Sequence, residues 1–185
     1  VDSLAMGKEA GKISQGDRSI AIGVSAGKEN QGDSSIAIGW AAAGLGQSTY
    51  SVVVGSLAAS AGAAEQTTAV GGLASGRGTG DTSIGYGSGS NNLTGSYNTA
   101  LGWQAGNDYI VNLTNTTALG RSSNLTGSNQ IQLGNSTTTT YTYGAVQNRS
   151  DVRDKDGVVD TSLGLSFITS LRPVEYKWDY REDYR

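Results

Sequence analysis

One five-residue phrase recurs through most of the chain and constrains its fold more than any other feature. The clearest copy is Ser19-Ile20-Ala21-Ile22-Gly23, in which two aliphatic residues alternate with small ones. In the first six copies the closing glycine recurs every 16 residues, at Gly7, Gly23, Gly39, Gly55, Gly71 and Gly87. Three further copies close at less regular intervals, at Gly102, Gly120 and Gly134. A repeat of this kind indicates a stacked architecture, in which one unit cannot bury its apolar side alone.

Each copy of the phrase has the pattern of a short β-strand. Ile20 and Ile22 alternate with small residues at a period of two, which places the aliphatics on one face and the small residues on the other. The closing glycine suits a corner, and the rest of the unit, such as residues 30–33 (Asn-Gln-Gly-Asp), has turn chemistry. One strand and one corner region per coil predict an all-β fold, a repeat β-roll or solenoid.

The composition supports a solenoid over an ordinary globule. The chain has 28 Gly, one Phe and one Met, so a single globular core would lack large apolar side chains. A solenoid needs only two or three aliphatics per coil, and we expect these to stack on those of the next coil. Disorder is the alternative for so much Gly, Ser, Thr and Asn, but disordered segments have no reason to keep a period.

Several classes of function are disfavoured by residues that the chain lacks. Without Cys or His there are no disulfides, no thiolate ligands and no imidazole for zinc or for general-base catalysis, so we expect no metal and no cofactor. The net charge of −3, without a basic stripe, argues against a nucleic-acid partner. No apolar run approaches the roughly 18 residues of a membrane span, so no membrane insertion is expected.

The distribution of charge divides the chain near Arg149. Residues 1–148 hold 14 charged side chains, whereas the much shorter segment 149–185 holds 15. We therefore predict a roll over 1–135, an exit strand or linker over 136–149, and a small α+β segment over 150–185. In the last segment, a helix ending before Pro173 is predicted to carry Leu163, Phe167, Ile168 and Leu171 on one face.

The repeated phrase, most clearly over Ser19–Gly55, resembles the head repeats of YadA-like trimeric adhesins. About three quarters of the chain shares this resemblance. It implies a left-handed β-roll and a homotrimer whose chains pack side by side. We expect the Ala and Gly face of each roll to form the close contact between chains.

Residues 150–178 resemble the C-terminal intramolecular chaperone of phage tail fibres, tail spikes and endosialidases. The resemblance rests on three separated stretches in the family's order: Ser150–Lys155, Gly164–Ile168 and Leu171–Trp178. It implies a module that assists trimerisation and folding and then cuts itself off. The cut would fall between Arg149 and Ser150, with Ser150 and Lys155 as the catalytic dyad.

The proposed dyad is chemically reasonable in a chain without histidine. A serine hydroxyl needs a base to become nucleophilic, and a lysine with a depressed pKa is the available candidate. At most, this is single-turnover autoproteolysis and not a turnover enzyme. The alternative is a charged linker in which Ser150 is incidental.

Exposed aromatic residues are the candidates for binding a receptor. Trp40 and Trp103 each follow a repeat glycine, at a position that varies between copies and is therefore expected to face outward. We take Trp40, Trp103 and Tyr109 as candidate receptor contacts, since exposed aromatics often bind sugars or proteins. The alternative is that they pack over a corner of the roll.

These features together predict the distal segment of a trimeric phage tail fibre that binds a host receptor. The expected partners are a host cell-surface glycan or outer-membrane protein and other virion tail proteins, and the expected location is the virion, outside the cell. The first alternative is the head of a bacterial trimeric autotransporter adhesin on the cell surface. The second is a polysaccharide-degrading tail spike, which would need paired acids in a groove.

Overall fold

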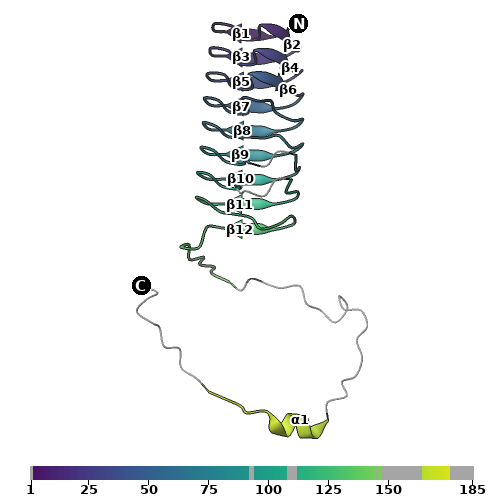
Figure 1. The fold of residues 1–185 in the computed structure, drawn as a ribbon, viewed down its shortest axis with the longest axis vertical. Coiled ribbons are helices and arrows are strands. Elements are labelled where there is room, and N and C mark those ends of the chain that lie inside the picture. Colours follow the sequence, from purple (N-terminus) through teal and green to yellow (C-terminus); the bar gives the residue numbers. More distant parts are fainter. Residues whose placement is uncertain (1, 92–93, 108–111, 145, 147–163, 176–185) are drawn as a thin grey trace. The chain divides into compact units, whose positions relative to one another are not determined.

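The computed structural model describes residues 2–91, 94–107, 112–144, 146 and 164–175. They belong to two compact units, Val1–Tyr141 and Thr142–Arg185. The first unit is a roll of short three-residue strands, visible as a stack of coils in Figure 1. Its strands are β1 (Leu4–Met6), β2 (Ile13–Gln15), β3 (Ile20–Ile22), β4 (Glu29–Gln31), β5 (Ile36–Ile38), β6 (Leu45–Gln47), β7 (Val52–Val54), β8 (Thr68–Val70), β9 (Thr82–Ile84), β10 (Thr99–Leu101), β11 (Thr117–Leu119) and β12 (Ile131–Leu133).

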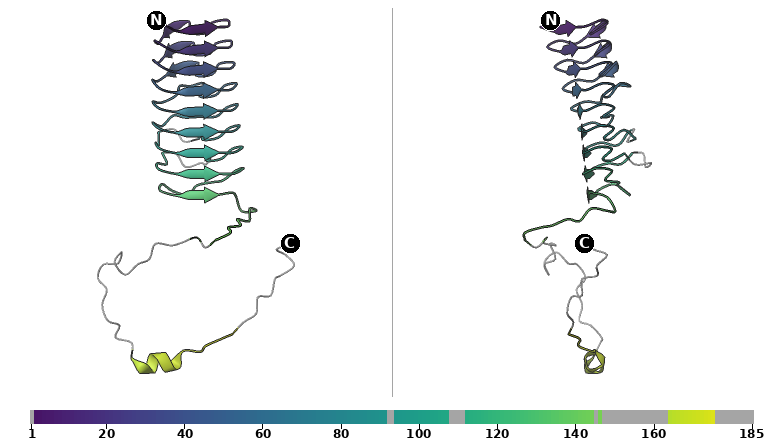
Figure 2. Two further views of the ribbon diagram at one scale, coloured as in Figure 1. Left: turned by 180° about the vertical axis from the view of Figure 1, so that it is seen from behind. Right: turned by 90° about the vertical axis from the view of Figure 1, so that its left-hand side faces the viewer.

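The repeated phrase forms one long parallel sheet. Its nine strands follow the order β1-β3-β5-β7-β8-β9-β10-β11-β12, one strand per coil. The other side of the first three coils carries the three-stranded sheet β2-β4-β6, and Figure 2 shows the two layers edge-on. Each strand pairs in parallel with its equivalent in the next coil, so Ile20 lies beside Ile36 and Ile22 beside Ile38. The predicted all-β repeat roll is confirmed.

The glycine that closes the sixth coil is Gly85, whereas the 16-residue period predicted Gly87. Ser83 pairs with Ala69 and therefore occupies the middle of its strand rather than the position before it. The closing glycines stack directly, because a Cβ built on Gly71 would lie 2.6 Å from the carbonyl oxygen of Gly85. The sixth coil is thus two residues shorter than the four coils before it that end at Gly23, Gly39, Gly55 and Gly71. The phrase there is Asp81-Thr82-Ser83-Ile84-Gly85.

The two faces of each strand are arranged in the opposite sense to the prediction. The small residue at the centre of the strand points into the roll, and Ala21, Ala37 and Ala69 are fully buried there. The flanking aliphatics face outward, so Ile20 and Ile22 are only half-buried. The expectation that aliphatics fill the roll and that small residues meet the neighbouring chain is therefore wrong. The core of the first five coils consists of ten alanines and Val53.

The narrow interior explains this arrangement. Opposite the long sheet, the space beside the buried alanines is filled by a column of glutamine side chains, of which Gln31 and Gln47 are 2% exposed. The amide of Gln47 donates to the carbonyls of Ile36 and Ser51, at 2.9 and 3.2 Å, and accepts from Gln31 at 3.3 Å. Branched aliphatics inside every coil would overpack a space that alanines and extended amides already fill.

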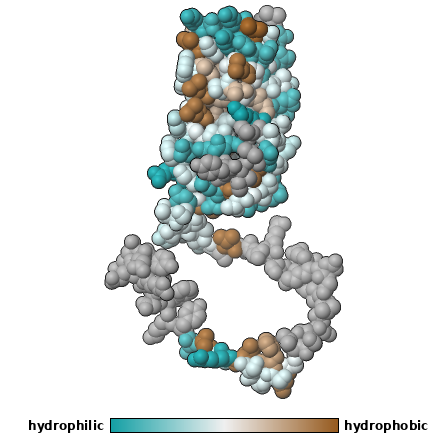
Figure 3. All heavy atoms as spheres, viewed as in Figure 1, coloured by the Kyte–Doolittle hydropathy of each residue, from teal (hydrophilic) through white to brown (hydrophobic). Residues whose placement is uncertain are grey.

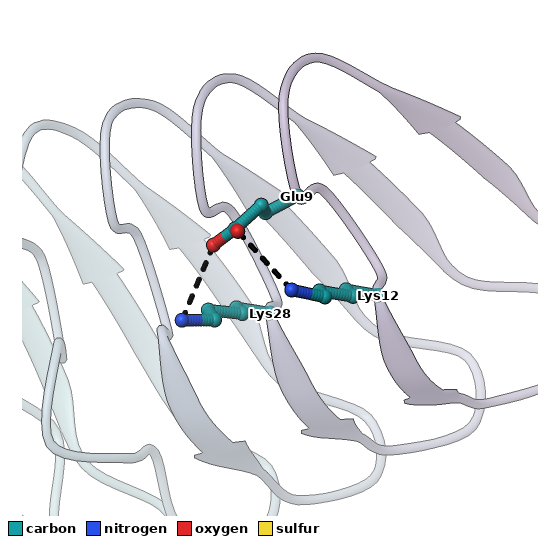
Figure 4. A network of polar contacts seen from close by, with 3 residues as sticks. All are labelled: Glu9, Lys12 and Lys28. Atoms are coloured by element: carbon teal, nitrogen blue, oxygen red, sulfur yellow. Dashed lines mark hydrogen bonds and ion pairs between the residues drawn. The ribbon is translucent and has the colours of Figure 1, made fainter.

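A surface network joins the first two coils (Figure 4). The carboxylate of Glu9 contacts the ammonium groups of Lys12 and Lys28, at 3.1 and 3.2 Å. The hydrogen bond from Lys12, followed by that from Lys28, lowers the pKa of Glu9. The three side chains keep 32–51% of their surface in contact with solvent, so we expect the network to contribute little to stability.

The second unit contains the helix α1 (Leu165–Ser170), which begins after Gly164 and ends before Leu171. This short helix includes the predicted Phe167 and Ile168, whose side chains are both exposed. It ends at Ser170, so two residues separate it from Pro173. Leu163 lies outside the described residues. The exit strand expected over 136–149 is not formed at residues 136–144 or 146, and the remaining residues of that range lie outside those described. Instead, Asn135 and Thr138 close a turn directly after β12, with Thr138 N–H donating to Asn135 O at 3.0 Å.

Candidate functional site

The outward face of the nine-stranded sheet carries two columns of side chains. The column formed by the last residue of each strand is apolar in every coil: Met6, Ile22, Ile38, Val54, Val70, Ile84, Leu101, Leu119 and Leu133. The column formed by the first residue is aliphatic in the first four coils and threonine in the next four. Neither column contains a charged residue. We call the column formed by the last residue of each strand the apolar stripe.

A further column of side chains, which we call the corner column, runs along the corner that follows the strands of the long sheet. Trp40, Tyr86 and Trp103 occupy it, and the backbone confirms the alignment, since Leu57 N–H donates to Trp40 O and Gln104 N–H donates to Tyr86 O, each at 2.8 Å. The three aromatic side chains are 47–55% exposed, so Trp40 and Trp103 face outward as predicted. Whether they bind a receptor stays a prediction.

The two tryptophans do not form one site. Trp40 lies in the third coil and Trp103 in the seventh, and four coils at about 4.8 Å each separate them by about 19 Å. Tyr86, in the coil directly before Trp103, brings a second aromatic into that neighbourhood. The remaining predicted site residues, Tyr109, Ser150 and Lys155, lie outside the described residues.

Two adjoining hollows open on the roll beside Tyr86. The first, about 280 Å³ in volume, is lined by alanines and serines together with Arg77, Tyr86, Gln104 and Asn107. The second, about 290 Å³, shares Gln104 and Asn107 and adds Asn91, Ser122 and Asn124. On the face seen in Figure 3, the described atoms of the lower coils are mostly polar, whereas apolar side chains gather over the upper, N-terminal coils.

A buried polar network crosses the sixth, seventh and eighth coils. Asp81, which is 4% exposed, replaces the buried serine that precedes the strand in earlier coils, such as Ser35. Its carboxylate accepts from Gly78 N–H at 2.9 Å and from both N–H groups of Asn98. Asn98 in turn accepts from the hydroxyl of Thr116 at 2.7 Å. Burial raises the pKa of Asp81 to about 6, against the opposing effect of these hydrogen bonds.

Among the described residues, no group of three or more acidic side chains is arranged to hold a metal ion. No helix within the same residues is long and apolar enough to span a membrane.

Comparison with solved structures gives a likeness of low sequence identity. The collagen-binding domain of the Yersinia adhesin YadA is a similar solved structure, with 19% sequence identity and a TM-score of 0.48, over 91% of this chain and 96% of that one. No family model matches the chain. No curated protein matches it either. At this identity and TM-score, the likeness by itself assigns no function.

Sequence reasoning missed Asp81 and Tyr86 for the same reason. Asp81 lies in the shortened sixth coil and Tyr86 directly follows its closing glycine, so a strict 16-residue period places both residues two positions out of register. With Gly85 as the closing glycine, Asp81 aligns with the buried serines and Tyr86 with Trp40. The signal was present in the chain, because residues 81–85 end in glycine and match Thr67-Thr68-Ala69-Val70-Gly71 in pattern.

Proposed function

We propose that this chain is an extracellular adhesion module, the head of a bacterial surface adhesin in which three rolls pack side by side. The apolar stripe carries the proposal. It runs along all nine coils, no charged residue interrupts it, and several of its side chains are about half exposed, including Met6 at 58% and Leu101 at 47%. A continuous exposed apolar surface of this kind marks an interaction site.

A second copy of the chain is the partner that best fits the stripe. Two rolls aligned in parallel have the same coil spacing, so each apolar residue meets its equivalent at the same height. Any other partner would need apolar groups repeated at the same spacing along the axis of the roll over nine coils. The number three comes from the resemblance of Ser19–Gly55 to YadA-like heads. Such packing leaves the corner column, with Trp40 and Trp103, available to a host glycan or protein.

Adhesion suits this build because many weak contacts act together. Nine coils at about 4.8 Å give a rod of about 40 Å, long enough to display several loops and aromatic side chains on each chain. Three copies held together convert weak individual sites into strong attachment. The YadA domain, with a comparable architecture, is named for binding collagen, and collagen is therefore one surface to test.

Fluorescent beads coated with the full chain test this proposal. Wild-type beads are expected to attach to wells coated with collagen or with a sialylated mucin. Ile38→Asp, which places a charge in the apolar stripe, should weaken both trimer formation and attachment. Leu45→Asp is the matched control, since Leu45 is 56% exposed on the opposite sheet, and it should preserve both. Failure of wild-type beads on both surfaces would overturn the adhesion function.

A second candidate is the distal segment of a phage tail fibre. The observation that favours it is the order of the three chaperone-like stretches in residues 150–178, the second of which ends inside α1. In this account the module assists trimerisation and then cleaves between Arg149 and Ser150, and virion tail proteins are the partners. Expression of the full gene, as wild type and as Ser150→Ala, tests it: two identical full-length bands on a denaturing gel would remove it.

A further inference from the structure

The two hollows beside Tyr86 combine one cation with several uncharged polar groups. Arg77 is exposed, and it has no ion pair or side-chain hydrogen bond within the part of the chain that the structure describes. Among the described residues that line the two hollows, none is acidic. The guanidinium of Arg77 therefore makes the local electrostatic potential positive. Its planar array of N–H groups can bind a carboxylate through two parallel hydrogen bonds.

Tyr86 supplies an apolar surface at the edge of the first hollow. Its ring lies over the backbone of Gly72 in the preceding coil, where a Cβ built on Gly72 would be 3.2 Å from Tyr86 Cδ2. The glycine thus makes room for the ring, and half of the side chain stays exposed. A ring supported from beneath in this way can stack against the C–H face of a sugar at little cost in conformational entropy.

Amide side chains occupy the boundary that the two hollows share. Gln104 and Asn107 line both of them. The hydroxyl of Ser90 donates to Asn107 Oδ1 at 2.6 Å, which holds the amide of Asn107 in place. Amides both donate and accept, so they match the hydroxyls of a sugar. Together the two hollows, of about 280 and 290 Å³, offer more space than one sugar ring fills.

We propose that the two hollows form one binding site for an acidic oligosaccharide. Arg77 binds the carboxylate of a sialic or uronic acid, Tyr86 stacks on a sugar ring, and Gln104 and Asn107 bind hydroxyls of the same and the next ring. Such sites combine an apolar platform with a few placed polar groups. The proposal deepens the adhesion function proposed above by naming the class of receptor.

Calorimetric titration of the full chain with soluble oligosaccharides tests the site. The probes are 3′-sialyllactose, a hyaluronan tetrasaccharide as the uronic-acid source, and lactose as the neutral control. At least one acidic probe is expected to bind roughly tenfold or more tightly than lactose, because a charge-assisted contact is added. Which of the two binds distinguishes the sources. Absence of binding by both acidic probes at millimolar concentration would overturn the proposal.

Three variants separate this site from general electrostatic attraction. Arg77→Gln should lose the preference for the acidic probe, and Tyr86→Ala should weaken that probe's binding as well. Arg18→Gln removes another exposed cation, which lines neither hollow, and should leave binding unchanged. Equal losses in Arg77→Gln and Arg18→Gln would contradict the proposal. The molecular mass, measured on the same samples, shows separately whether the trimer of the proposed function is present.

Discussion

Asn98 donates its backbone N–H and its side-chain N–H to one oxygen of the buried Asp81 carboxylate, at 2.9 and 3.1 Å. This contact joins the sixth coil to the seventh at the point where the coil length changes from 14 to 17 residues, counted from Gly71 to Gly85 and from Gly85 to Gly102. The buried serines of earlier coils bond within their own turns, as Ser35 does to Gly32. The Asp81–Asn98 pair instead crosses between coils of unequal length.

The stability of the roll should depend on pH through Asp81. Its pKa is raised from 3.8 to about 6 in the folded chain, so the native state holds the proton more tightly than the unfolded state. The contribution of Asp81 to stability is therefore greatest below about pH 4, falls as the pH rises to about 6, and levels off above that, a change on the order of 3 kcal/mol. Thermal melting across this range measures the slope.

Asp81→Asn should remove that slope. The amide keeps an acceptor oxygen but does not ionise, so melting should be nearly constant between about pH 4 and 7 as far as this site contributes. Asp33→Asn serves as the control, because Asp33 is an exposed turn residue and its replacement should leave the slope in place. Indistinguishable pH profiles for wild type and Asp81→Asn would show that Asp81 is not the titrating group.

A methyl group on the stacked glycines should disrupt the coils. Gly39 has φ +128°, and a Cβ there would lie 2.5 Å from the carbonyl oxygen of Gly55. Gly39→Ala should therefore destabilise the roll by more than the roughly 1–3 kcal/mol of backbone strain alone. Gly46→Ala is the matched control: Gly46 also has positive φ, at +74°, but a Cβ there would have no other atom within 4 Å. Equal losses in urea unfolding would contradict the role of stacking.

The glutamine column should be sensitive to loss of its amides. Gln47→Leu leaves the carbonyls of Ile36 and Ser51 without their side-chain donor, which should cost about 1–3 kcal/mol in unfolding free energy. Gln15 makes the equivalent bond to Leu4 O, at 3.0 Å, but in the more exposed first coil. Gln15→Leu should consequently cost clearly less. A larger loss at Gln15 than at Gln47 would show that burial does not determine the contribution of these amides.

Neighbouring residues of β5 test which face of the strand is the interior. Ala37 is fully buried, so Ala37→Leu should overpack the roll and destabilise it by roughly 1–3 kcal/mol or more. Ile38→Leu adds no volume and lies on the outward face, so folding of the roll should barely change. Circular dichroism melting of both variants checks this. The opposite ranking would favour an interior filled by the aliphatics.

The strand positions were predictable from the sequence because alternation and period depend on local chemistry. The repeated Ser-Ile-Ala-Ile-Gly phrase located each of the first five strands of the long sheet. Which face lies inside was not predictable in the same way. The alternation in Ile36-Ala37-Ile38 allows either the two isoleucines or the alanine to point into the roll. The width of the interior decides which of them does. That width is set by the corners and by the Gln31–Gln47 column, which carry no hydrophobic signal.

The candidate site was less predictable than the fold. Trp40 and Trp103 were identifiable as outward-facing because their position varies between repeats. Arg77 and Gln104 were not, because they line the hollow only when coils of unequal length are stacked in the right register. The shortened coil that ends at Gly85 displaced that register, and insertions after it weakened the period further.

The mass of the native species tests the central claim most directly. Light scattering on the intact 19.0 kDa chain at micromolar concentration should give three times that mass, about 57 kDa, if the apolar stripe joins three rolls. Ile38→Asp should shift the distribution toward single chains while Leu45→Asp does not. A wild-type mass of 19 kDa, with the stripe exposed on a stable monomer, would contradict the account.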